Sequence, residues 1–175
     1  MISDRMQEAL NKQVTAEFHA AHLYLSMAAH FQSLNLDGFA AWMRAQWLEE
    51  TGHAMMIFNF INDRGGKVAL GQIDAPPTAW ESPLAAFEAA YGHEQKVTAM
   101  IGDLVELAAA EKDHATGVFL QWFVTEQVEE EDHASTAVEK LKLVQGSPNG
   151  LFMMDRAMGA RPVKVPPSVA GGGDQ

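Results

Sequence analysis

The sequence has no cysteine among its 175 residues, and this absence excludes several kinds of site at once. Disulfides, thiolate zinc sites, iron–sulfur clusters and cysteine nucleophiles all require a thiol. Any metal ion that the chain binds must therefore be held by oxygen and nitrogen ligands.

Basic residues and long apolar runs are also scarce. The chain has 12 Lys and Arg against 23 Asp and Glu, a formal net charge of -11, which argues against nucleic-acid binding and suits a protein that gathers cations. No window approaches the roughly 20 apolar residues of a membrane span, and the N-terminus lacks the basic start of a targeting segment. We therefore expect a cytoplasmic protein with neither nucleic acid nor membrane as a partner.

Helical periodicity is abundant. Apolar residues recur at helical spacing in four long segments, at about 3–31, 37–64, 82–108 and 113–144. The connection at 65–81 is rich in Pro and Gly and long enough to span a bundle from end to end. This order predicts an all-α four-helix bundle of two antiparallel hairpins joined by a long crossover, with a short fifth helix at 151–158. We expect one domain over residues 1–160 and a flexible C-terminal tail over 161–175.

Acidic residues interrupt the apolar faces of these segments at their midpoints. In "WLEETGHAMMIFNFI", at 47–61, Glu50 and His53 stand one turn apart on the face that should point inward. A buried carboxylate costs several kcal/mol unless a cation, a hydrogen-bond network or a metal ion compensates it. This pair alone decides nothing, because short motifs of this kind arise often by chance.

Polar residues lie at the same depth in the other three segments. Counting from the predicted helix starts at 1.5 Å per residue, the midpoints fall about 21 Å along each helix. The polar residues at that level are Glu17, Glu50 with His53, Glu94, and Gln127 with Glu130. Midpoints of bundled helices meet at one level, and four converging carboxylates would repel one another unless cations such as two divalent metals neutralise them.

Four motifs carry a resemblance that covers residues 3 to 158. The stretches "ALNKQVTAEFHAAHLYLSMA", "LEETGHAMMIFNFI", "HEQKVT" and "FLQWFVTEQVEEE" resemble the corresponding segments of non-haem bacterial ferritins without a gap in any helix. The resemblance implies the ferritin-like bundle and a di-iron ferroxidase centre with Glu17, Glu50, His53, Glu94, Gln127 and Glu130. It places Glu17 and His53 on one iron, Glu94 and Glu130 on the other, and Glu50 as the bridge.

Further residues are implied by the same resemblance. Glu49, Glu126 and Glu129 match acids that form a third iron site, and Tyr24 and Trp122 match an aromatic pair that can supply electrons near the metals. The implied function is iron storage and detoxification: iron(II) is oxidised by O₂ or peroxide, and ferric mineral is deposited inside a hollow shell of 24 subunits. Carboxylates with one imidazole suit iron(II) that must meet oxygen.

Related di-iron proteins are weaker alternatives. Bacterioferritin binds haem through a methionine, but Gly52 stands at that position and Glu130 stands where that protein has histidine, so we expect no haem. Rubrerythrin-like peroxidases need cysteines for their rubredoxin part. A purely structural bundle would have little reason to keep oxygen ligands at four midpoints.

The last long helix offers a second possible pair of metal ligands. Glu130 and His133 repeat the Glu-x-x-His spacing used by di-iron oxygenases. His133 lies roughly 9 Å beyond the midpoint. We therefore predict the pair Gln127 and Glu130 at the metals and His133 outside them.

Overall fold

The computed structural model describes residues 1–162, and all regular secondary structure in that range is helical. In chain order the helices are α1 (Asp4–Ser33), α2 (Asp37–Asp63), α3 (Pro83–Ala110), α4 (His114–Leu143) and α5 (Pro148–Met158). The prediction of four long helices and a short fifth one is confirmed. No helix in this range combines the length and the apolar character that crossing a membrane requires.

Side-chain caps set the start of three long helices. Ser3, Ser82 and Asp113 each accept a hydrogen bond from the backbone N–H three residues further on, which satisfies a donor that the first turn leaves unpaired. Pro83 follows Ser82 at a position where its fixed φ suits a helix. α2 differs, because its N-cap is Leu36, which has no side chain able to accept such a bond.

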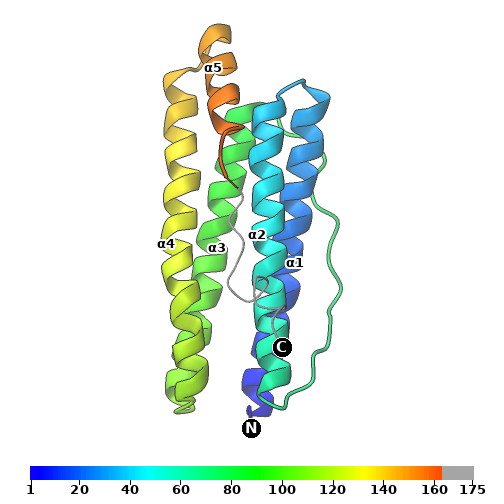
Figure 1. Cartoon of the computed structure of the whole chain (residues 1–175), viewed down its shortest axis with the longest axis vertical. Helices are drawn as coiled ribbons and strands as arrows, with labels where there is room; N and C mark the ends of the chain where they lie inside the picture. The colour runs from blue at the N-terminus through cyan, green and yellow to red at the C-terminus, as the bar shows by residue number, and fades with distance from the viewer. Residues whose placement is uncertain (163–175) are drawn as a thin grey trace, which may run out of the picture.

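The long crossover carries the chain back along the bundle beside α1 (Figure 1). The Asn11 side chain donates to Lys67 O at 3.0 Å and accepts from Ala69 N at 2.8 Å, and Gly71 N donates to Thr15 Oγ1 at 3.1 Å. These bonds hold the connection against α1. The two hairpins, α1 with α2 and α3 with α4, therefore lie as predicted, with α1 packed on α3.

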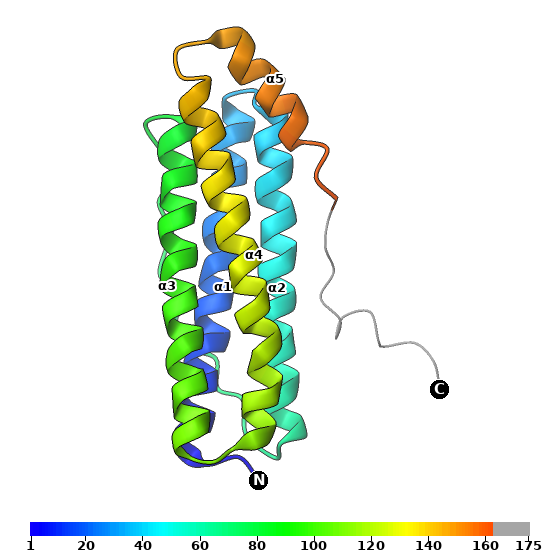
Figure 2. The same cartoon turned by 90° about the vertical axis from the view of Figure 1, so that its left-hand side faces the viewer.

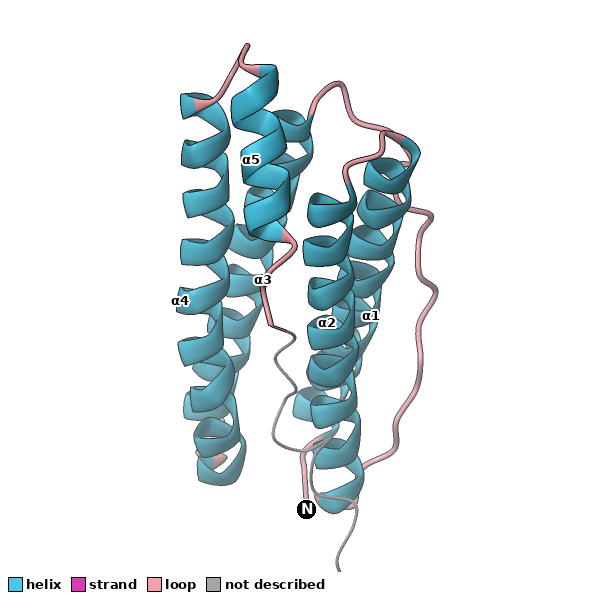
Figure 3. Ribbon diagram, turned by 45° about the horizontal axis from the view of Figure 1, so that its top comes forward, coloured by secondary structure: helices cyan, strands magenta, loops and turns pink. Residues whose placement is uncertain are grey.

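α5 lies across one end of the bundle, packed mainly on α2 (Figures 2 and 3). Residues 159–162 follow α5 and bring Arg161 between Glu49 of α2 and His133 of α4 (Figure 1). Most of the predicted tail, residues 163–175, lies outside the described residues, so the domain boundary after residue 160 stays a prediction.

The apolar core consists of two separate clusters. One surrounds Phe31, Phe39 and Phe87 near the α5 end, and the other surrounds Leu10 and Ile57 near the opposite end. The helix midpoints lie between these clusters. Whatever polar residues occupy them are enclosed by apolar side chains on both sides.

Candidate metal centre

A buried polar layer fills the space between the two apolar clusters. Its side chains come from all four long helices and are between 1% and 5% exposed: Gln13, Glu17, Gln46, Glu49, Glu50, His53, Glu94, Glu126, Gln127 and Glu130. Carboxylates rarely occur this deep without partners, because each loses its hydration. The layer therefore requires either shared protons or bound cations.

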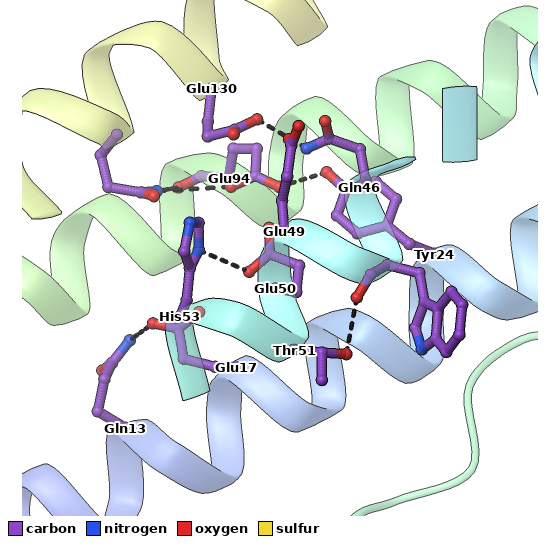
Figure 4. A network of polar contacts seen from close by, with 12 residues as sticks. Gln13, Glu17, Tyr24, Gln46, Glu49, Glu50, Thr51, His53, Glu94 and Glu130 are labelled. Carbon is purple, nitrogen blue, oxygen red and sulfur yellow. Dashed lines mark hydrogen bonds and ion pairs between the residues drawn. The ribbon is translucent and has the colours of Figure 1, made fainter. Parts of the chain in front are cut away.

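Glu17, Glu50 and His53 come closest to one another (Figure 4). Each offers one ligand atom within 4.8 Å of those of the other two, and they are the only group of three such residues found between residues 1 and 162. His53 Nδ1 lies 3.3 Å from Glu50 Oε2. Gln13 donates to Glu17 Oε1 at 2.8 Å, whereas Glu17 Oε2 is buried with no hydrogen-bond partner.

Glu17 Oε2 is informative, because it receives no hydrogen bond from a donor side chain and faces the carboxyl group of Glu50, so either a proton shared between the two acids or a cation is needed there. Mixed carboxylate and imidazole donors are ligands that iron(II) and similar divalent ions accept. A cation between Glu17, Glu50 and His53 would satisfy Glu17 Oε2 and offset the repulsion among the acids. The residues present therefore fit a metal ion at this point.

Glu94 and Glu130 form a second part of the layer, on the side of α3 and α4. Tyr24 donates its hydroxyl to Glu94 Oε1, and Gln127 Nε2 lies 3.4 Å from Glu94 Oε2. Gln46 Nε2 donates to Glu130 Oε2 at 2.7 Å. Neither carboxylate joins the group of Glu17, Glu50 and His53 within 4.8 Å, but both are near enough to Glu50 to affect its protonation.

Burial and mutual repulsion raise the pKa values of Glu17, Glu50 and Glu94 in this layer. Burial and then the Glu50 carboxylate raise the pKa of Glu17 to about 8, and burial and then Glu130 raise the pKa of Glu94 to about 7. Burial, followed by Glu94 and Glu130, raises the pKa of Glu50 well above its ordinary value. Without a bound cation, the layer therefore retains protons near neutral pH, and metal ions would displace them.

The two predicted aromatic residues contact different parts of the layer. The Trp122 ring lies edge-on to the His53 ring, with centroids 5.3 Å apart, whereas Tyr24 is bonded to Glu94. Tyr24 also meets Trp42 edge-on at 6.3 Å. One aromatic side chain thus borders each half of the layer.

The acids predicted to form a third site do not gather as closely. Glu49 is buried on α2, Glu126 is buried on α4, and Glu129 is exposed one turn further along α4. They do not form a group within 4.8 Å of the kind that Glu17 belongs to. Glu49 Oε2 instead accepts a hydrogen bond at 3.0 Å from Arg161, a residue that follows α5.

His133 lies outside the layer, as the depth count predicts. It is exposed on α4, and its Nδ1 is 3.5 Å from Arg161. Glu130 is buried and faces Gln46. The geometry thus favours the register that pairs Gln127 with Glu130.

Three polar residues of this region lay outside the sequence prediction of the site. Gln13 stands one turn before Glu17, and Gln46 stands one turn before Glu50, so helical spacing could have found both. Arg161 had no such signal, since it belongs to the segment predicted as tail.

Comparison with known proteins supports the same reading. Residues 7–144 match the family described as the ferritin-like domain. The chain is 44% identical over 161 residues to the bacterial non-heme ferritin of Bacteroides fragilis strain 638R, covering 92% of this chain and all of that protein. It is 38% identical to the bacterial non-heme ferritin of Staphylococcus aureus strain USA300, covering 92% of this chain and 97% of that protein.

A solved structure resembles the whole described bundle. An open pore ferritin from the hyperthermophilic archaeon Archaeoglobus fulgidus superimposes with a TM-score of 0.92 at 52% identity, covering 93% of this chain and all of that one. This agreement spans the four long helices that carry the polar layer.

Proposed function

The chain belongs to the ferritin family, and on that premise we propose that it stores iron by oxidising iron(II) within the buried polar layer. Ferritins store iron and have ferroxidase activity in general. The proposal therefore concerns which residues of this chain bind the iron(II) that is oxidised. One observation carries the proposal. Glu17, Glu50 and His53 converge between two apolar clusters, and one carboxylate oxygen of Glu17 receives no hydrogen bond from a donor side chain.

Two iron(II) ions are the substrate in this proposal. Glu17 and His53 hold one, Glu94 and Glu130 hold the other, and Glu50 lies between them. The two ions together give two electrons to O₂, which takes up two protons to become H₂O₂; with peroxide as oxidant, two electrons and two protons yield two waters. The resulting iron(III) hydrolyses and adds to a mineral.

The protein contributes charge, geometry and protons. Iron(II) displaces the protons held by Glu17 and Glu94, so the layer changes from neutral acids to carboxylates as it fills. Gln13 donates to one oxygen of Glu17, and Gln46 donates to one oxygen of Glu130. Each bond fixes the orientation of its carboxylate and leaves the other lone pairs for a metal ion. Apolar clusters on both sides keep bulk water away.

Further parts of the proposal concern assembly and additional iron. We place the subunit in a hollow shell of 24 copies that encloses the mineral, in the cytoplasm. Glu49, Glu126 and Glu129 bind further iron beside the first two ions. The surplus of acidic residues suits a protein that attracts cations.

The decisive test replaces Glu50 by Ala in the assembled protein. Stopped-flow mixing of aerobic iron(II) with protein, at two ions per subunit, should show a fast oxidation phase that Glu50→Ala removes, while electron microscopy still shows intact shells. Glu106→Ala is a matched control, because Glu106 is exposed on α3. A fast phase that persists at full rate in Glu50→Ala would exclude Glu50 as the residue shared by the two ions.

A further inference from the structure

Arg161 is the residue that links the end of the described chain to the polar layer. Its guanidinium donates to Glu49 Oε2 at 3.0 Å and to Gln46 Oε1, and it lies over the Trp42 ring, 4.8 Å from the centroid. The Arg161 side chain is 16% exposed and the Glu49 side chain 1% exposed. Most of this ion pair is therefore shielded from water.

The contact continues into the proposed centre. Gln46 accepts from Arg161 through Oε1 and donates through Nε2 to Glu130 Oε2 at 2.7 Å. A single amide thus connects Arg161 with a carboxylate that we assign to iron. Movement of the guanidinium would remove one of the two bonds that fix this amide.

The anchoring of α5 explains why Arg161 reaches this place. The Phe39 backbone N–H donates to Asp155 Oδ1 at 2.9 Å, so a side chain of α5 caps α2, which Leu36 cannot do. Gly38 permits the close approach, because a Cβ there would lie 1.7 Å from Asp155 O. Asp155 is thereby fixed at the start of α2, and the chain has only six residues to reach Arg161.

We infer that Arg161 is a resident cation at Glu49, and that a metal ion binds at Glu49 only when this guanidinium withdraws. The inference rests on the proposed function, since it concerns iron beyond the first two ions. A guanidinium and a divalent ion carry like charge and compete for the lone pairs of one carboxylate, so each lowers the affinity of Glu49 for the other. Loading of the third position is therefore coupled to displacement of the Arg161 guanidinium.

The coupling also gives an order of filling. The hydrogen bonds described for Arg161 go to Gln46, Glu49 and His133 and not to Glu17, Glu50 or His53, so these three can take metal while Arg161 stays bound to Glu49. An additional ion must first break a charge-assisted hydrogen bond that is largely buried, which lowers its affinity. The first two ions thus bind before the third.

The test compares the assembled wild-type protein with Arg161→Gln, using Zn(II) so that no oxidation occurs. Calorimetric titration counts the ions bound per subunit, and anomalous diffraction from crystals at low and high Zn(II) locates them. Arg156→Gln is the matched control, because Arg156 is an exposed arginine of α5. Arg161→Lys retains the charge but loses the fork that reaches Glu49 and Gln46 together.

We expect the ion held by Glu17 and His53 to bind equally in wild type and Arg161→Gln, and an additional ion at Glu49 to bind about tenfold more tightly in Arg161→Gln. Arg161→Lys should fall between them, and Arg156→Gln should match wild type. In wild-type crystals with metal at Glu49, the guanidinium should have left that carboxylate.

Three results would overturn the inference. These are equal affinity for the additional ion in both proteins, no additional ion at Glu49 in either, or metal at Glu49 with Arg161 still bound to it. Should Arg161→Gln fail to assemble, the wild-type crystals decide the matter alone. Failure of the proposed function looks different, because wild type would then bind no ions at Glu17, Glu50 and His53.

Discussion

The hydroxyl of Tyr24 on α1 donates a hydrogen bond to Glu94 Oε1 on α3, and both side chains are buried. Burial and then the Glu94 carboxylate raise the pKa of the phenol well above its ordinary value, so Tyr24 remains a donor throughout the working pH range. This bond favours the charged form of Glu94 and partly opposes the burial that raises the pKa of that acid to about 7. Tyr24 therefore helps Glu94 to act as a metal ligand.

Tyr24→Phe tests this role with little change in shape. The ring still fills its apolar surroundings, so the subunit should fold, but the pKa of Glu94 should rise further without its donor. We expect the metal ion assigned to Glu94 to bind about tenfold more weakly at neutral pH, judged from the usual strength of bonds to charged groups. Anaerobic calorimetry with iron(II) measures this.

Tyr91→Phe is the control for that change, because Tyr91 is the other tyrosine of the chain and lies half-buried on α3. Unchanged metal affinity in Tyr24→Phe would show that the hydroxyl does not assist Glu94. A selective loss in Tyr24→Phe would support the assignment of Glu94 to iron.

The metal-free protein should lose stability as pH rises. Glu17 and Glu94 have folded pKa values of about 8 and about 7, above the ordinary 4.5, so the folded chain holds more protons than the unfolded chain between pH 4.5 and 8. Their contribution is fully present below pH 4.5, and it declines as pH rises through about 7 and then about 8. Thermal unfolding of metal-free protein across this range should show Tm falling with pH.

Metal binding should have the opposite dependence on pH. Ions displace the protons on Glu17 and Glu94, so affinity should increase up to about pH 8, and binding at pH 6 should release protons. Calorimetry in buffers of different ionisation enthalpy counts the protons released on metal binding. Glu17→Gln should release fewer protons than wild type. Binding with no proton release at pH 6 would contradict the raised pKa values.

The depth of the buried acids could be predicted because helix pitch and cap chemistry are local. Ser3, Ser82 and Asp113 are the caps observed, so counting residues from them places Glu17, Glu94 and the Gln127 turn at one level. Glu50 joins them because α2 begins at Asp37, as the turn before it predicts.

The contacts of α5 could not be predicted in this way. Asp155 caps a helix that begins 118 residues earlier in the chain, and Arg161 pairs with Glu49 across 112 residues. No periodicity connects such distant residues. Their meeting depends on the packing of α5 on α2, which depends in turn on the missing side chain of Gly38.

Gly38→Ala tests that packing. The new methyl group would collide with the backbone of Asp155, and overpacking of this kind typically costs about 1–3 kcal/mol. We expect α5 to separate from α2, with faster hydrogen exchange in Pro148–Met158 and at the Phe39 amide. Gly102→Ala is the control, since a Cβ there meets nothing within 4 Å, and it should stabilise α3 by about 0.5–1 kcal/mol. Unchanged exchange in α5 would mean that the close approach at Gly38 is dispensable.

The register of α4 gives the last prediction, because Glu130 belongs to both candidate ligand pairs and only its partner differs. His133 is exposed and lies beside Arg161, whereas Gln127 is buried and faces Glu94. His133→Ala should therefore leave the binding of the first two ions intact. Glu130→Ala should weaken the second ion by about tenfold or more, because losses of even outer contacts at metal sites reach that size. Anomalous diffraction from crystals soaked in iron(II) tests the geometry directly, and iron bonded to His133 but distant from Gln127 and Glu130 would reverse the assignment.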